Sequence, residues 1–125
     1  MKIKNLLSHS FNPRAKKNKY NNKRTVVDGI NFQSILEAKY YIKLKAWVEL
    51  GEVVGFFRQV PLDLAGGIKY RMDFLIFFKD GTCECVDVKG VETKEFKLKK
   101  KLIEEAYPWL DLKITNGKDG GSSVS

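Results

Sequence analysis

Apolar and polar residues are arranged along the middle of the chain in two patterns, one typical of helices and one of strands. From residue 34 to about 50, apolar and aromatic residues are dense, and Ser34 and Glu37 form the Ser-x-x-Glu sequence of a helix capping box. A second helix is predicted from Thr93 to about residue 107, where the next residue is a proline.

Several shorter runs of apolar residues predict strands. They cover residues 53–60, 68–78, 82–89 and 110–114. Pro61 is expected to stop the first strand, although residues 62–64 could continue it at a sheet edge. The order helix, strand, strand, strand, helix, strand predicts an α/β or α+β domain with one mixed sheet flanked by helices.

Turn-forming and charged segments mark the ends of this domain. A small hairpin is predicted at residues 25–32, because Asp28-Gly29 favours a tight turn. Residues 1–19 are expected to form a flexible basic arm, residues 20–115 the domain, and residues 116–125 a flexible Gly- and Ser-rich tail.

The composition limits the class of protein. With 43% hydrophobic residues the chain can bury a core, and its net charge of +8 suits nucleic acid, an anionic membrane or an acidic partner. No apolar run has the length of a membrane span or a signal peptide, so we expect a cytoplasmic protein. Cys83, Cys85 and the single histidine, His9, do not make a zinc site, and the two thiols are expected to be small buried residues.

The candidate chemistry depends on the register of one predicted hairpin. Asp87 and Lys89 share a strand face. A two-residue loop would place Asp73 opposite Val88, whereas a three-residue loop ending at Gly81 would place Asp73 opposite Asp87. Three-residue loops commonly end with a residue in the left-handed region, where glycine fits best, so we predict the three-residue loop.

Two carboxylates paired across strands, with Cβ atoms roughly 5 Å apart, repel each other unless a cation lies between them. Hard oxygen ligands favour Mg²⁺, with Mn²⁺ as a substitute. We therefore expect a metal site made of Asp73, Asp87 and a backbone carbonyl, for which that of Val88 is the candidate. Lys89 on the same face could orient the attacking water or stabilise charge on phosphorus, so the pattern indicates phosphodiester hydrolysis.

Further candidates leave alternatives open. Glu37 is either a third acid of the metal site or only a capping-box residue, and Gln59 is either a neighbour of the site or an ordinary strand-end residue. Basic residues are either phosphate contacts or parts of a solvated surface; they are Lys94, Lys97 and Lys101 on one face of the second helix, with Lys23 and Arg24 near the arm.

The ordered set of an acid on the first helix, an acid on a strand and Asp-x-Lys on the next strand resembles the PD-(D/E)XK nuclease superfamily. It is more closely similar to short phage and prophage nucleases that were long catalogued as a domain of unknown function and linked to Holliday-junction resolution. The similarity spans about residues 20–114, and its segments are 28–34, Glu37-Ala38, Gly51, 58–61, Asp73-Phe74 and 87–90.

The resemblance implies a restriction-endonuclease-like core and Mg²⁺-dependent cleavage of DNA in a bacterial host. It makes Glu37, Asp73 and Asp87 the metal-site acids and Lys89 the catalytic lysine, with Gln59 a neighbour. Two positions depart from the pattern of relatives: Met72 replaces the proline of the superfamily's name, and Gln33 stands where many relatives have an acid.

Three functions follow as hypotheses. The first is an endonuclease acting on branched DNA in phage replication or recombination. The second is a nicking, flap or single-strand nuclease. The third is a nucleic-acid-binding module without catalysis, which clustered acids argue against because they repel phosphate. The resemblance also suggests a homodimer, for which Tyr40, Phe56 or Trp109 could supply contacts, although each residue also fits a core.

Overall fold

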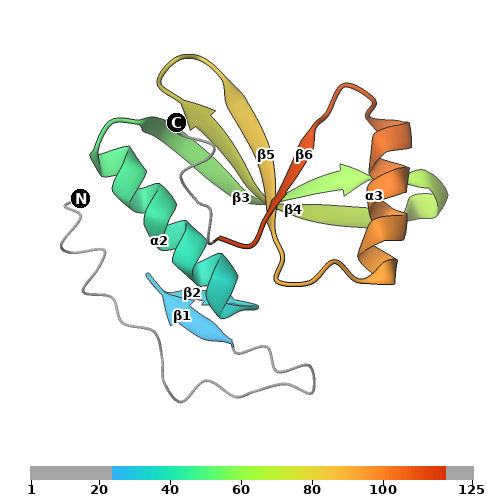
Figure 1. The fold of residues 1–125 in the computed structure, drawn as a ribbon, viewed down its shortest axis with the longest axis horizontal. Coiled ribbons are helices and arrows are strands. Elements are labelled where there is room, and N and C mark those ends of the chain that lie inside the picture. The colour runs from blue at the N-terminus through green and yellow to red at the C-terminus, as the bar shows by residue number, and fades with distance from the viewer. Residues whose placement is uncertain (1–23, 118–125) are drawn as a thin grey trace.

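A computed structural model describes residues 24–117 and has a mixed α+β fold (Figure 1). Its elements in chain order are β1 (Thr25–Val27), β2 (Ile30–Phe32), α2 (Ile35–Glu49), β3 (Val53–Asp63), a short 3-10 turn (Ala65–Gly67), β4 (Lys69–Phe78), β5 (Cys83–Val88), α3 (Lys94–Ala106) and β6 (Leu112–Thr115). This order confirms the predicted fold class. The predicted arm and all but the start of the predicted tail lie outside the described residues.

The central sheet has four strands in the order β3-β4-β5-β6. The first three strands pair antiparallel, and β5 pairs parallel with β6. A parallel pair needs a crossover connection, which α3 provides. The predicted hairpin is also present as a separate two-stranded sheet of β1 and β2.

Each helix covers a different part of the sheet. The core under α2 contains Phe74, Ile76 and Val86, whereas the core under α3 contains Met72, Phe96 and Leu112. Figure 1 shows the two helices beside opposite ends of the long β3–β4 pair. Since Met72 belongs to one core and Phe74 to the other, Asp73 lies where the two cores meet.

The β4–β5 hairpin has the predicted register. Phe74 pairs with Val86 and Phe77 with Cys83, which places Asp73 opposite Asp87. The loop between the strands closes with a hydrogen bond of 2.9 Å from the Phe78 amide to the Thr82 carbonyl. Gly81 has a φ of 90°, so the three-residue loop ends in the left-handed region that glycine adopts most easily.

Pro61 does not stop β3, which continues to Asp63. β3 is an edge strand, and proline is tolerated there because an edge strand needs only one set of ladder hydrogen bonds. The predicted starts of both helices are confirmed, because Ser34 Oγ accepts from the Glu37 amide and Thr93 Oγ1 accepts from the Phe96 amide, each at 3.1 Å.

The expectation that both cysteines are buried was wrong. Cys83 is exposed at the start of β5, and Cys85, two residues further along the strand, is half-buried against the core under α3. Tyr40 and Phe56 pack in the core under α2, whereas Trp109 is 78% exposed. Among residues 24–117, no helix is long and apolar enough to cross a bilayer.

Candidate active site

A groove of about 920 Å³ opens where α2, β3, β4 and the end of β5 meet. Five of the residues chosen from the sequence line it: Glu37, Gln59, Asp73, Val88 and Lys89. A Cβ on Gly90 would lie 3.3 Å from Leu36 Cδ1. The chain after β5 therefore runs against the start of α2, and this close approach brings Lys89 and Glu37 to the same groove.

Hydrogen bonds from backbone amides hold the Asp73 and Asp87 side chains in place. The Asp73 amide donates to Asp87 Oδ1, and the Val88 amide donates to Asp73 Oδ2, both at 2.8 Å. The Tyr70 hydroxyl donates to the other oxygen of Asp87, which is completely buried. These bonds replace the strand ladder beyond Phe74 and fix the two carboxylates side by side.

The charge on these acids is only partly balanced. Burial, followed by the nearby charges of Asp87 and Glu37, raises the pKa of Asp73 to about 7. The Val88 amide and Lys89 oppose this shift in the pKa without cancelling it. At neutral pH the groove is therefore short of positive charge beside Asp73, although the chain as a whole carries a net charge of +8.

Glu37 uses its backbone for the helix cap and its side chain for the groove. The carboxylate is 5% exposed; its Oε2 accepts from Gln59 Nε2 at 3.0 Å and lies 3.8 Å from an Arg58 guanidinium nitrogen. Burial raises the pKa of Glu37, and the charge of Arg58 opposes the rise. Glu37 therefore caps the helix through its amide while its side chain lines the groove, and its role in a metal site stays a prediction.

Gln59 is placed by an unusual backbone conformation. Its φ is 54°, in the left-handed region, in the middle of β3. The Nε2 group contacts both Glu37 Oε2 and Asp73 Oδ1, the second at 3.4 Å. The strand therefore accepts backbone strain at the residue whose amide lies between two acids. Gln59 is a neighbour of the site, as predicted.

Replacing Gln59 by Gly and by Ala should separate strain from contact. Both variants lose the amide between Glu37 and Asp73, but only Gly relieves the positive φ. We expect Gln59→Gly to be more stable than Gln59→Ala by about 1 kcal/mol, measured by urea unfolding. At Gly55, which has open space around it and no positive φ, the Gly→Ala change serves as the control and should cost little. Equal stability of the two Gln59 variants would contradict the strain at this residue.

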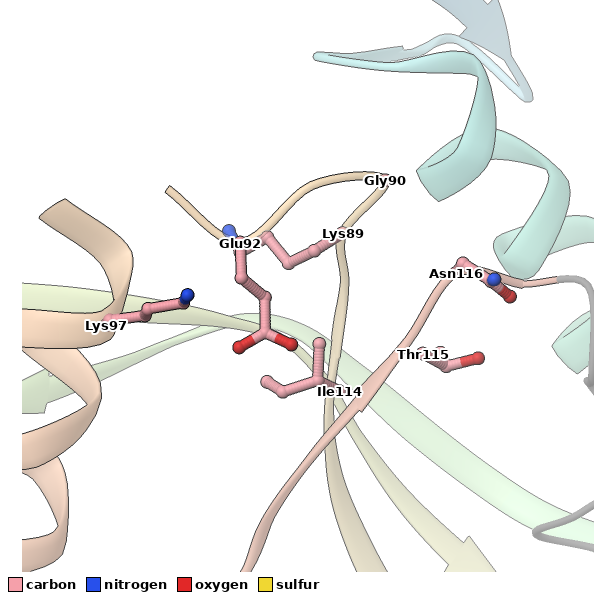
Figure 2. Close-up of a pocket in the computed structure, with 7 residues that line it drawn as sticks. All are labelled: Lys89, Gly90, Glu92, Lys97, Ile114, Thr115 and Asn116. Atoms are coloured by element: carbon pink, nitrogen blue, oxygen red, sulfur yellow. The ribbon is translucent and has the colours of Figure 1, made fainter. Parts of the chain in front are cut away.

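Lys89 lies between the groove and a second, smaller pocket. That pocket has a volume of about 430 Å³ and is lined by Lys89, Glu92, Lys97 and the end of β6. Figure 2 shows the side chains of Lys89 and Lys97 pointing toward each other from the end of β5 and from α3, with Glu92 between them. The lysine can therefore face an anion entering from either side.

The predicted phosphate contacts are only partly gathered around the site. Lys94, Lys97 and Lys101 are all exposed on α3, but only Lys97 lines one of the two pockets. Arg24 is exposed before β1, and Lys23 lies outside the described residues.

Sequence reasoning missed two residues of the site, Arg58 and Tyr70. Arg58 neighbours Gln59 on β3 and contacts Glu37, and Tyr70 holds Asp87 from β4. The sequence did contain hints of both residues. Tyr70 carries a hydroxyl three residues before Asp73, and Arg58 carries a charge next to Gln59.

Two neighbouring carboxylates can begin a site for a hard cation, but the side chains do not form a complete set of metal ligands. Among residues 24–117, no three His, Cys, Asp or Glu side chains are gathered as a finished metal site. The carboxylates of Asp73 and Asp87 lie side by side, with the buried Asp87 already accepting hydrogen bonds at both oxygens, whereas the Gln59 amide separates Glu37 from Asp73. The residues present suit Mg²⁺ or Mn²⁺ held first by the two aspartates.

Comparisons with known proteins give the family and nothing on its activity. Residues 17–118 match a family model described as a protein of unknown function, DUF1064. No curated protein and no solved structure matches the chain. The match covers most of the chain, and the protein therefore belongs to the DUF1064 family.

Proposed function

We propose that the protein is a Mg²⁺-dependent endonuclease that hydrolyses phosphodiester bonds in DNA. The observation that supports this most is the convergence of Glu37, Asp73 and Lys89, from α2, β4 and the end of β5, on one groove, with the buried Asp87 beside Asp73. Burying acids that repel one another costs free energy, and a divalent cation bound beside a lysine would offset that cost. A net charge of +8 draws a polyanion toward the groove.

Each residue has a role set by its position. Asp73 and Asp87 would hold the cation, with Glu37 and the Val88 carbonyl completing the set, and Mn²⁺ could replace Mg²⁺. When bound, the ion supplies Lewis acidity and a lowered pKa for a bound water. Lys89 at the groove edge orients the water or stabilises charge on the phosphate, and Gln59 keeps Glu37 and Asp73 apart when no cation is bound.

Branched DNA is the substrate we propose, in phage replication or recombination inside a bacterial cell. The support is the ordered set of motif residues, which resembles that of junction-cleaving phage nucleases. Paired cuts on a junction need two sites, so a homodimer belongs to the same proposal. Nicking, flap or single-strand cleavage without junction preference is the alternative within the nuclease class.

A binding module without catalysis fits the groove less well. A surface that only binds DNA gains from cations and loses from carboxylates, because phosphates repel them. Besides the exposed Glu95, three acids line or adjoin the groove, and two of these three are buried at 0% and 5% exposure. Burying charged groups has a free-energy cost, which a catalytic role explains and a binding role does not.

Cleavage of a labelled four-way junction, set beside the matched linear duplex, a flap and a single strand, tests the proposal. Each substrate is incubated with Mg²⁺, Mn²⁺ or EDTA. We expect paired symmetric cuts in the junction with either metal and none with EDTA. Equal cutting of every substrate would indicate a general nuclease, and tight binding without cutting in any condition would indicate the binding module.

The basic face of α3 should affect binding more than chemistry. Replacing Lys94, Lys97 and Lys101 by Ala removes three exposed charges. If these lysines contact phosphates, the slope of log K against log salt should fall by about 0.9 for each phosphate that is no longer neutralised, measured by fluorescence anisotropy.

The control for this variant is the double replacement of Lys69 and Lys79 by Ala. These lysines are exposed and paired with Asp63 and Glu52. Their removal should leave the salt dependence close to that of the wild type. An unchanged slope in the α3 variant would show that DNA does not contact that face.

A further inference from the structure

Two aromatic rings lie beneath the ammonium group of Lys89. Lys89 Nζ is 4.8 Å from the centre of the Phe96 ring and 5.9 Å from that of Tyr70. The two rings are themselves 6.1 Å apart and tilted by 46°. Tyr70 belongs to β4 and Phe96 to the first turn of α3. We call these two rings the aromatic seat of Lys89; they come from two elements that are distant in the sequence. In Figure 2 the Lys89 side chain extends from the end of β5 toward α3.

These rings are the main partners of the ammonium. Within the described part of the chain Lys89 takes part in no ion pair. A cation within about 6 Å of an aromatic ring centre is attracted to the ring face, and more strongly where water is excluded. Phe96 is 5% exposed and Lys89 is half-buried, so water is partly excluded here. The rings therefore hold the ammonium together with the charges of Asp73 and Glu37.

Tyr70 contacts Asp87 as well as Lys89. Its hydroxyl donates to the buried Asp87 carboxylate, while its ring contacts Lys89 two residues further along. One side chain thus touches both an acid and the lysine of the groove.

We propose that Tyr70 and Phe96 are positioning residues that hold Lys89 at the wall between the two pockets, and that Tyr70 links this position to the orientation of Asp87. The inference rests on the proposed function, because Lys89 and Asp87 are the groups whose chemistry it supports. Phe96 contacts Lys89 and the Tyr70 ring, whereas the Tyr70 hydroxyl contacts Asp87. The two contributions can therefore be separated by substitution.

The experiment compares the full-length wild type with Tyr70→Phe and Phe96→Leu. The first readout is the NMR shift of the Lys89 ε-methylene protons, assigned by their absence in Lys89→Arg. Ring currents should move these protons upfield in the wild type and in Tyr70→Phe, and most of this shift should be lost in Phe96→Leu, where only the more distant Tyr70 ring remains. This readout needs no cleavage.

The second readout is single-turnover junction cleavage as a function of Mg²⁺ concentration. Phe96→Leu should cleave roughly 10-fold more slowly at saturating Mg²⁺ with its half-maximal Mg²⁺ concentration unchanged, as loss of about 1.4 kcal/mol of positioning implies. Tyr70→Phe should need about 10-fold more Mg²⁺, as for other residues that orient a metal ligand.

Phe78→Leu is the matched control, since Phe78 is also buried but belongs to the core under α2. It should lower stability without moving the Lys89 protons or the half-maximal Mg²⁺ concentration. Phe96→Met replaces Phe96→Leu if the latter does not fold.

Two results would overturn the inference: an ordinary chemical shift for the Lys89 protons in the wild type, or a Phe96→Leu variant that keeps both the upfield shift and the cleavage rate. If the wild type cleaves DNA, the proposed nuclease function would stand in either case. If the wild type cleaves no substrate, the proposed function fails, and an upfield shift that disappears in Phe96→Leu would still establish the aromatic seat.

Discussion

The Asp87→Asn variant is expected to lose DNA cleavage by at least about 1000-fold, because the metal contributes several kcal/mol to the transition state. Asp87 is completely buried and accepts hydrogen bonds from the Asp73 amide and the Tyr70 hydroxyl. Asn has the same shape but no charge, so it should leave the groove nearly unchanged in form. DNA binding should be retained or become tighter, since one repulsive carboxylate has been removed.

The matched control is Asp111→Asn, which makes the same change at an exposed acid outside the groove. It should cleave like the wild type. Cleavage is followed on labelled junction DNA with Mg²⁺, and binding is followed with Ca²⁺ in place of Mg²⁺. If Asp87→Asn kept wild-type cleavage, the assignment of the groove as the active site would be wrong.

The Asp73→Asn variant is expected to stabilise the metal-free protein at alkaline pH while abolishing cleavage. The pKa of Asp73 is about 7 in the folded protein, against an ordinary value of 3.8. Between these values the folded state holds more protons than the unfolded state. The stability of the wild type therefore falls as the pH rises through this window, and the loss is complete above about pH 7. Because Asn carries no charge, the variant should not lose stability in this way as the pH rises.

The measurement is the melting temperature in EDTA at pH 4.5 and pH 8. Asp73→Asn should exceed the wild type at pH 8 by at least about 4 °C, which corresponds to about 1 kcal/mol for a domain of this size. The difference should be much smaller at pH 4.5, where Asp73 of the folded wild type is protonated. Mg²⁺ should raise the melting temperature of the wild type at pH 8 and leave that of the variant unchanged.

Asp111→Asn again serves as the control and should show no such dependence on pH. A variant that is less stable than the wild type by the same amount at both pH values would show that the electrostatic conflict around Asp73 is absent.

The hairpin register could be predicted because one local rule decides it. A three-residue loop needs a positive φ at Gly81 alone, whereas a two-residue type I′ loop would need one at Asp80 as well, and only the three-residue loop brings Asp73 opposite Asp87. The helix starts could be predicted for the same reason, since Ser34 and Thr93 act on amides three residues away. Local chemistry therefore explains most of the element order.

The parts that could not be predicted depend on contacts between distant elements. The aromatic seat of Lys89 needs Tyr70 and Phe96, which meet only because α3 packs on the far half of the β3–β4 pair. The positive φ of Gln59 has no sequence signal, because glutamine has no preference for that conformation. The continuation of β3 past Pro61 likewise depends on its place at the sheet edge.

The binding of a divalent cation by the two aspartates is tested most directly by titrating Mn²⁺ into the full-length protein and following its amide NMR signals. Paramagnetic broadening at substoichiometric Mn²⁺ should begin at Glu37, Asp73, Asp87 and Lys89 and be absent from the same signals in Asp73→Asn. The distant β4–β5 turn at Gly81 should remain sharp. Broadening that begins at other acids, or that is the same in Asp73→Asn, would show that the groove does not hold the metal and would remove the basis for a nuclease.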